Sequence, residues 1–161
     1  MTSEQLSIRP VFIDAPRNPN LQQLFAYWDE KRGNRRAPTR EDIRAEEIMP
    51  LLPDVMIWST EKIGGPFIIR RVGENIARFV GRNHTGALAT DFMPPDAAEM
   101  MAHLLTRVAV TMTPLFRTGK AFWHPGRAHR EFEVCYLPLS ADGISANMIL
   151  GGITFPPDST D

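Results

Sequence analysis

Two stretches of the chain carry apolar side chains at the three- and four-residue spacing of an amphipathic helix. The longer one covers residues 95–112 and has an apolar stripe that includes Met101 and Val108. The other begins after Asn20, a good N-cap residue, and ends at Gly33. Its apolar face consists of Leu21, Leu24, Phe25 and Trp28. Each helix therefore has one face that must be buried, against a sheet or against a partner.

Two shorter helices are also predicted. One lies just before Gly81, which stands where a left-handed C-cap is expected. Its apolar residues at helical spacing are Ile76, Phe79 and Val80. The other could begin at Thr39 or Asp42, both of which are capping residues. It carries Ile43, Ile48 and Leu51.

The remaining periodic segments have the composition of strands. They cover residues 55–58, 67–72, 115–123, 130–139 and 147–155. From Phe132 to Leu139 the only charged residue is Glu133, whereas a strand with one face in water alternates apolar and polar residues. We therefore predict that both faces of this strand are covered. The order of elements predicts an α+β fold with one five-stranded antiparallel sheet, helices mainly on one face and the N-terminal helix packed outside.

Composition narrows the classes of function. The chain has 161 residues, of which 43% are hydrophobic and 23% charged, and its net charge is −1. A balanced charge argues against binding of nucleic acid by phosphate neutralisation and against a polybasic membrane anchor. Since no run approaches the length of a membrane span, no membrane insertion is expected. The single cysteine, Cys135, cannot form an internal disulfide and fits a reducing compartment, so a cytoplasmic location is expected.

The chain length predicts one domain. Residues 1–19 contain three prolines and little periodicity, so they are expected to be an extended or partly disordered arm. Residues 20–155 hold all the predicted helices and strands and form the domain. Residues 156–161 are expected to be a C-terminal tail.

Several short phrases occur along residues 21–153 in the order found in a known family. They are Leu24 to Trp28, Pro38 to Ile43, Leu51 to Pro53, Arg70 to Gly73, Phe79 to Arg82, Thr85-Gly86, and Glu133 with Leu137 to Ser140. Each phrase is weak alone, but their number and order make the chain resemble PAS domains, and in particular the PAS_5 family of single-domain alphaproteobacterial PAS proteins. The resemblance implies a PAS fold and a sensory, signal-transducing role rather than an enzyme. Output would then pass through contacts with a partner protein.

The resemblance supplies no ligand. The chain lacks the Asn-Cys-Arg phrase of flavin-binding photoreceptor PAS domains, and Cys135 lies on a predicted strand, so flavin is not expected. His103 on the long helix could in principle ligate haem, but no second ligand or haem-attachment motif accompanies it. His124 and His129 flank a predicted turn and are too few for a stable zinc site. No cofactor or metal is therefore required by the sequence.

Aromatic and apolar residues of the C-terminal strands and the helices could line a cavity between sheet and helix. The candidates are Phe79, Met101, His103, Leu105, Phe116, Trp123, Phe132 and Tyr136. A closed core has the same composition, so the sequence leaves both interpretations open. The helix face formed by Leu21, Leu24, Phe25 and Trp28 is the candidate interface of a homodimer, or else a cover for the sheet.

The sequence also allows two other functions, a receptor for a nucleotide second messenger and a small enzyme. Arg36 and Arg40 have the Arg-x-x-x-Arg spacing with which PilZ domains grip cyclic dinucleotides, although the partner motif Asp-x-Ser-x-x-Gly is absent. These arginines would be the anion site of a second-messenger receptor. The simpler interpretation is that Arg40 and Asp42 tie the loop to the domain. A small α+β enzyme would instead use His103, Asp91 or Glu133 for acid–base chemistry in the cavity.

Overall fold

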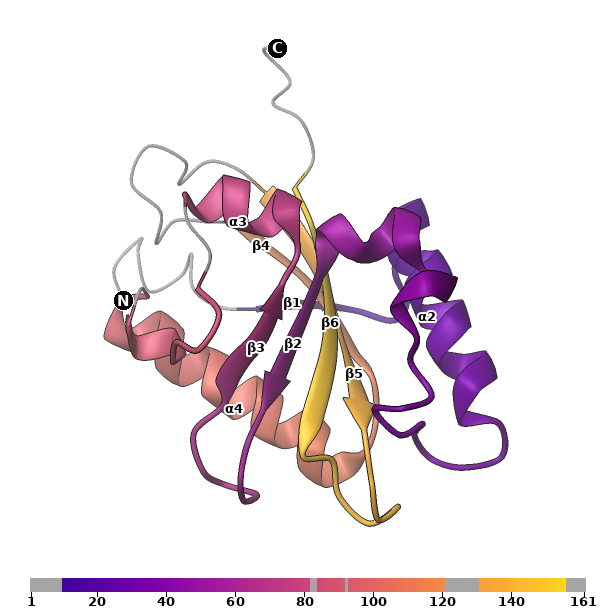
Figure 1. Ribbon diagram of the computed structural model, residues 1–161. Helices are drawn as coiled ribbons and strands as arrows, with labels where there is room; N and C mark the ends of the chain where they lie inside the picture. Colours follow the sequence, from indigo (N-terminus) through magenta and orange to yellow (C-terminus); the bar gives the residue numbers. More distant parts are fainter. Residues whose placement is uncertain (1–9, 82–83, 92, 121–130, 156–161) are drawn as a thin grey trace.

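The computed structural model describes residues 10–81, 84–91, 93–120 and 131–155. Within them, six antiparallel strands form one sheet in the order β1-β4-β5-β6-β2-β3 (Figure 1). The strands are β1 (Val11–Ile13), β2 (Val55–Ser59), β3 (Ile68–Val72), β4 (Leu115–Lys120), β5 (Glu131–Leu139) and β6 (Met148–Thr154). The predicted α+β fold class is confirmed, and the sheet has one strand more than the pattern predicted.

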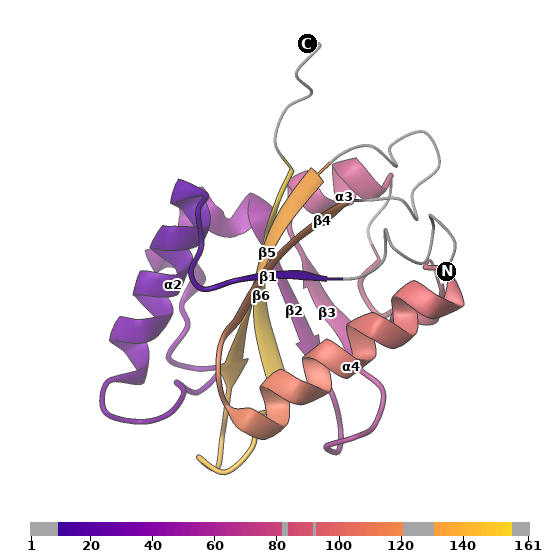
Figure 2. The ribbon, with the colours of Figure 1, turned by 180° about the vertical axis from the view of Figure 1, so that it is seen from behind.

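The additional strand is β1, which pairs with β4 through Val11 opposite Thr118 and Ile13 opposite Phe116. Figure 2 shows β1 leading from the edge of the sheet to the start of α2 (Pro19–Arg32). Three residues next to Pro10 are too short to show strand alternation, which is why the pattern did not reveal them. The expected N-terminal arm therefore contains a strand, while residues 1–9 and the expected tail 156–161 lie outside the described residues.

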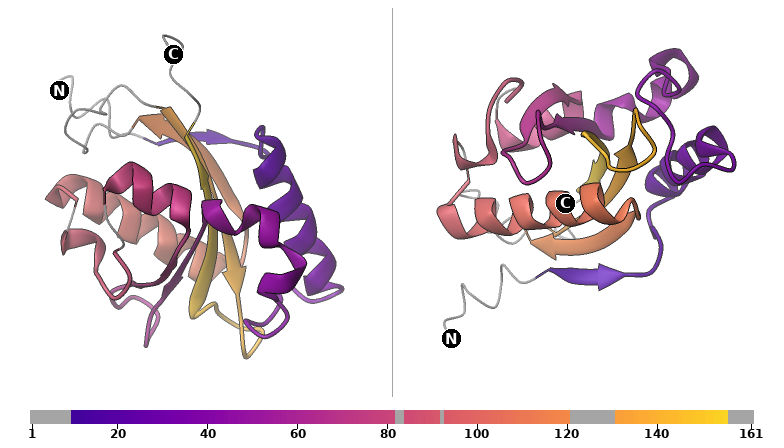
Figure 3. Two further views of the ribbon diagram at one scale, coloured as in Figure 1. Left: turned by 45° about the horizontal axis from the view of Figure 1, so that its top comes forward. Right: turned by 90° about the horizontal axis from the view of Figure 1, so that it is seen from below.

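Helices cover both faces of the sheet. Figure 3 shows α3 (Glu74–Val80) and α4 (Pro95–Thr111) on one side and α2 on the other. The stripe of α4 that includes Met101 and Val108 is buried, as its spacing predicts. Residues 132–139 of β5 are all buried, because β5 runs through the middle of the sheet between the two helical layers.

The start of α2 lies two residues before the predicted one. Asn18 is the N-cap rather than Asn20, and its Oδ1 accepts hydrogen bonds from the backbone N–H groups of Asn20 (2.8 Å) and Leu21 (3.4 Å). Pro19 follows as the first helical residue, where its missing N–H costs nothing. Gly33 caps α2 and Gly81 caps α3, at the two positions predicted for the helix ends, and both have positive φ. The left-handed cap predicted at Gly81 is confirmed.

The short helix predicted around Ile43 to Leu51 is replaced by two 3-10 helices, η1 (Ala45–Glu47) and η2 (Met49–Asp54). Pro50 and Pro53 remove backbone donors here, so a longer α-helix cannot form. Upstream, Thr39 and Asp42 form a reciprocal cap, because each backbone N–H donates to the side chain of the other residue, at 2.9 and 3.2 Å. A third 3-10 helix, η3 (Ala89–Asp91), precedes α4.

Candidate functional site

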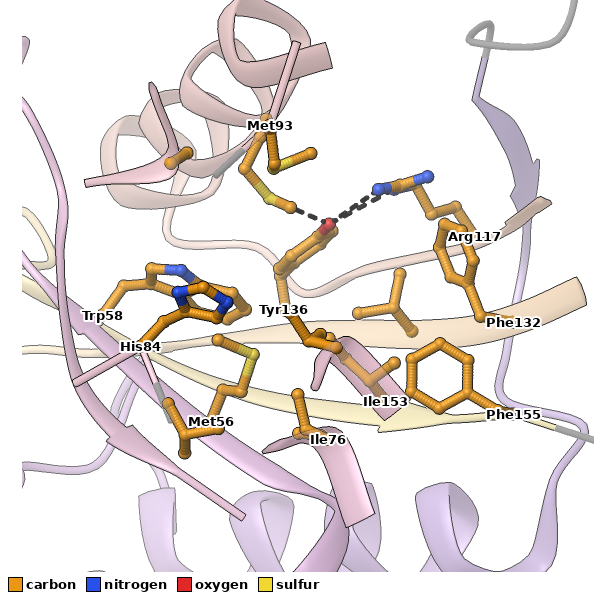
Figure 4. A pocket seen from close by; sticks show the side chains of 15 residues that line it. Met56, Trp58, Ile76, His84, Met93, Arg117, Phe132, Tyr136, Ile153 and Phe155 are labelled. Carbon is orange, nitrogen blue, oxygen red and sulfur yellow. Dashed lines mark hydrogen bonds between the residues drawn. The ribbon is translucent and has the colours of Figure 1, made fainter. Parts of the chain in front are cut away.

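A cavity of about 50 Å³ lies between the sheet and the helices α3 and α4. Its sheet wall comes from the inward-facing residues of the strands, among them Met56 and Trp58 of β2 and Tyr136 of β5. Its helical wall includes Ile76 of α3 and Met101 of α4 (Figure 4). One water needs about 10–15 Å³, so the cavity is large enough for a small organic group.

Trp58 reaches into the cavity wall because Gly151, two positions along β6 from its partner Ile149, has no side chain. A Cβ atom on Gly151 would collide with the Trp58 ring. The indole therefore lies across β6 and contacts Tyr136, with ring centroids 5.7 Å apart at 52°. Figure 4 shows Trp58 and His84 on one side of Tyr136 and Phe132 and Phe155 on the other. Most of the cavity surface is thus aromatic or aliphatic.

One polar cluster interrupts this apolar lining. The hydroxyl oxygen of Tyr136 accepts hydrogen bonds from Nε and Nη2 of Arg117, at 3.2 and 3.0 Å. The Tyr136 hydroxyl donates in turn to the Sδ atom of Met101, at 3.4 Å. Arg117 is only 3% exposed, and its guanidinium lies 5.0 Å from the centroid of the Phe132 ring. A cation is therefore held in an apolar wall of the cavity.

The sequence-based list of cavity residues matches this arrangement in part. Met101, Phe132 and Tyr136 line the cavity. Phe79 and Leu105 are buried but do not line it, and Phe79 stacks on the lining residue Phe155 at 3.7 Å between ring centroids. Trp123 lies outside the described residues.

Two further candidates face elsewhere, for reasons of periodicity. His103 is exposed, because the buried face of α4 contains Met101 and Leu104 and leaves residue 103 on the outside. Phe116 points to the opposite face of the sheet, where its ring meets Phe25 at 5.0 Å. The prediction that His103 and Phe116 line the cavity was therefore wrong, and His103 does not point toward it as a haem ligand would.

The cavity is also lined by residues that the sequence patterns did not indicate, namely Met56, Trp58, His84, Met93 and Arg117. Every residue of β2 is buried, so alternation gives no signal for Met56 and Trp58. Arg117 did carry a signal, because it is a charged residue two positions after Leu115 in an apolar strand. Two-residue periodicity places both side chains on the face of Tyr136.

The two arginines of the candidate anion site, Arg36 and Arg40, bind different backbone segments. Arg36 donates to the backbone oxygen of Thr111 at 2.5 Å, and Arg40 donates to that of Ile43 at 3.0 Å. Asp42, which was expected to tie the loop to the domain together with Arg40, forms an ion pair with Arg35 at 2.8 Å. The Thr39 N–H and then Arg35 lower the pKa of Asp42. Each of these arginines thus has a structural contact within the chain.

The acid–base candidates also lie outside the cavity. His103 and Asp91 are exposed, and Asp91 accepts the backbone N–H of Leu88 at 2.8 Å. Glu133 faces α2, where its Oε2 accepts the backbone N–H groups of Arg17 (2.8 Å) and Asn18 (2.9 Å). Within the part of the chain that the structure describes, no three His, Cys, Asp or Glu side chains gather as a metal site. Nor does any helix there have the length and apolarity to cross a membrane.

The candidate interface of α2 is used inside the chain. Leu21, Leu24 and Trp28 are at most 2% exposed and cover the sheet, and Phe25 is partly buried against it. The Trp28 Nε1 donates to the backbone oxygen of Pro138 at 2.8 Å. Of the two roles expected for this helix face, covering the sheet is the one observed.

A curved antiparallel sheet with its helices gathered over a small apolar cavity is the arrangement of a PAS sensory domain. The family model PAS_5, described as a PAS domain, matches residues 17–154. The chain therefore belongs to the PAS_5 family, as the order of its short phrases indicated.

Two solved structures are similar to this chain. One is the N-terminal domain of a diguanylate cyclase with PAS/PAC sensor from Marinobacter aquaeolei, with 13% identity and a TM-score of 0.44, covering 63% of this chain and 94% of that one. The other is a variant of RsLOV, with 10% identity and a TM-score of 0.47, covering 72% of this chain and 69% of that one. The search of curated proteins returned no match.

Proposed function

We propose that this PAS domain is a sensor that binds a small molecule in the cavity and passes its occupancy to a partner protein. The observation that carries the proposal is the cavity itself, which is bounded by apolar side chains from the sheet and from both α3 and α4. A mostly apolar hollow with a few polar groups is the usual form of a small-molecule site. A ligand there would contact the sheet and the helices at once, so its binding favours one arrangement of the two walls.

The residues required by the two alternative functions, the enzyme and the second-messenger receptor, do not lie together in one site. Acid–base catalysis needed His103, Asp91 or Glu133 in the cavity, and all three lie elsewhere. The second-messenger receptor needed Arg36 and Arg40 to grip one ligand, but their guanidinium groups donate to two different backbone segments. Recognition of a small molecule needs no such residues.

The proposed sensor acts in the cytoplasm through contacts with another protein, and a homodimer is one form in which it would do so. The motivating facts are the membership of the PAS_5 family and the balanced charge of the chain. Light scattering measures the oligomeric state, and capture of a partner from the host with and without ligand tests the output.

Native mass spectrometry of the protein purified from its own host tests ligand binding directly. We expect an added mass that is released on denaturation. Val134→Phe should abolish it, because Val134 lines the cavity and is 1% exposed, so the larger ring would fill the space. Val11→Phe is the matched control, since Val11 is 58% exposed at the sheet edge and the same change there leaves the cavity intact.

Two results would contradict the proposal. One is a wild-type protein from its own host that carries no bound molecule. The other is an added mass that persists in folded Val134→Phe protein at the wild-type level. Thermal melting of both variants establishes that they are folded before their bound masses are compared.

A further inference from the structure

Arg117 is a buried cation that has no acidic partner among the described residues. No Asp or Glu of the described residues forms an ion pair with it, and its guanidinium contacts the hydroxyl of Tyr136 and the rings of Phe132 and Tyr136. The nearest acidic residue on β5 in register, Glu133, points to the opposite face and binds backbone N–H groups of Arg17 and Asn18. Burial of a charge is costly unless an opposite charge compensates it.

The hydrogen bonds of the guanidinium leave capacity for another acceptor. Arginine has five N–H donors. Among the described residues, Arg117 uses Nε and Nη2, and both donate to the same Tyr136 oxygen. No bond from its Nη1 is found there, and the Tyr136 proton is directed to the weak acceptor Met101 Sδ. The cluster therefore supplies donors toward the cavity and lacks a strong acceptor.

The surroundings of Arg117 indicate which kind of ligand would pair with its guanidinium. A carboxylate matches the planar fork of a guanidinium with two parallel hydrogen bonds. Apart from His84, the remainder of the cavity lining is aromatic or aliphatic, so most of the rest of the ligand must be apolar. A volume of about 50 Å³ limits that part to a few carbon atoms unless side chains shift. Met56, Met93 and Met101 line the cavity, and methionine adapts to new shapes more readily than branched residues.

We infer that the cavity binds a small apolar monocarboxylate, with its carboxylate on Arg117 and its hydrocarbon part among Met56, Trp58 and Phe132. This inference rests on the proposed function and names the ligand class of the same site. Tyr136 is a positioning residue, because its hydroxyl holds the guanidinium in the wall of the cavity while its ring contributes to the apolar lining.

Calorimetry at neutral pH with matched acids and amides tests the inference. The probes are butanoate, hexanoate and benzoate, each compared with its primary amide, which has nearly the same shape but no charge. We expect at least one acid to bind at least tenfold more tightly than its amide. Arg117→Gln should remove that preference while the amide still binds, and Arg78→Gln should preserve it. Arg78 is a suitable control because its side chain is 68% exposed and pairs with Glu74 on α3, away from the cavity.

The outcomes separate this inference from the proposed function. If amides bind as tightly as acids, the cavity is a ligand site but the anionic class is wrong. If neither acids nor amides bind, the inference is overturned, and the native mass spectrum decides separately whether the sensor proposal stands. An acid preference that survives in Arg117→Gln also overturns it. The comparison of acids with amides uses the wild-type protein, so the test holds even if Arg117→Gln does not fold.

Discussion

Neighbouring residues of β5 have opposite chemical surroundings. Tyr136 points into the cavity, where its hydroxyl bridges Arg117 and Met101. Cys135 points to the α2 face, beside Gly152, and is fully buried. Burial raises the pKa of the Cys135 thiol to about 12, because the thiolate would lose its hydration there. One step along a strand therefore separates a polar cluster from an inert thiol.

Cys135 is expected to resist thiol reagents in the folded protein. Since the thiolate is the reactive form, a disulfide reagent at pH 8 should label the native protein no faster than the protein unfolds, and should label the guanidinium-unfolded chain at once. Rapid, complete labelling of the native protein would contradict this expectation.

The raised pKa of Cys135 also makes the stability of the fold depend on pH. The full contribution of the neutral thiol is present below the pKa of the unfolded chain, about 8.5. As pH rises from there toward about 12, the unfolded chain loses a proton that the folded one keeps, and stability falls by about 1.4 kcal/mol per pH unit. Urea unfolding of wild type and Cys135→Ala from pH 7 to 10 measures this, and the difference between them should change only above pH 8.5.

At single residues, sequence patterns predicted burial better than direction. Phe132 and Tyr136 were correctly placed on the cavity side, but Phe116 was assigned there although Arg117, its neighbour, has the inward position. An aromatic side chain alone does not specify a face, whereas the two-residue period of β4 places Arg117 and Phe116 on opposite faces. That Arg117 has no carboxylate partner among the described residues could not be predicted, because it depends on the face to which Glu133 points.

At the level of elements, α2 is attached to the sheet by one carboxylate as well as by its apolar face. Glu133 of β5 binds the two backbone N–H groups at Arg17 and Asn18, just before the helix begins. The negative charge also lies at the positive end of the helix dipole. This contact joins the N-terminal helix to the central strand.

Glu133→Ala is expected to destabilise the fold by about 1–3 kcal/mol, because two partly buried N–H groups lose their acceptor. Glu131→Ala is the matched control, since Glu131 lies on the same strand, is exposed, and should change stability by no more than about 0.5 kcal/mol. Urea denaturation measures both. Equal effects of the two substitutions would show that the contact with α2 contributes little.

The strongly periodic elements were predicted to within a few residues, among them α4, α3 and the strands β2 and β3. The failures have physical causes. β1 has only three residues and forms because β4 offers it an edge, which is a tertiary effect. The sequence could not distinguish a cavity from a closed core. Whether the large side chains meet depends on their packing and on Gly151 beneath Trp58.

For the whole molecule, the sheet lies between α4 on one face and α2 on the other, and this arrangement changes the expectation for assembly. The apolar face of α2 is already buried within the chain and cannot also form the core of an interface; it consists of Leu21, Leu24 and Trp28. A homodimer, if formed, must use another surface.

Trp28→Phe is therefore expected to lower stability without changing oligomeric mass. The substitution removes the donor to the Pro138 oxygen and should cost about 1–3 kcal/mol. Light scattering gives the mass and thermal melting gives the stability of each protein. Exposed Phe12→Ala provides the comparison, because its ring is 48% exposed and its loss should leave stability nearly unchanged. A fall in mass on Trp28→Phe would restore α2 as a dimer contact.

At Gly151-Gly152, β6 has no side chain on either face of the sheet. A Cβ on the first glycine would meet Trp58, and a Cβ on the second would meet Leu21 and Leu24 of α2. Only peptide backbone therefore separates an aromatic ring of the inner chamber from the outer helix. A displacement of that ring would therefore meet α2 through backbone alone at this point, with no intervening side chain of β6 to absorb it.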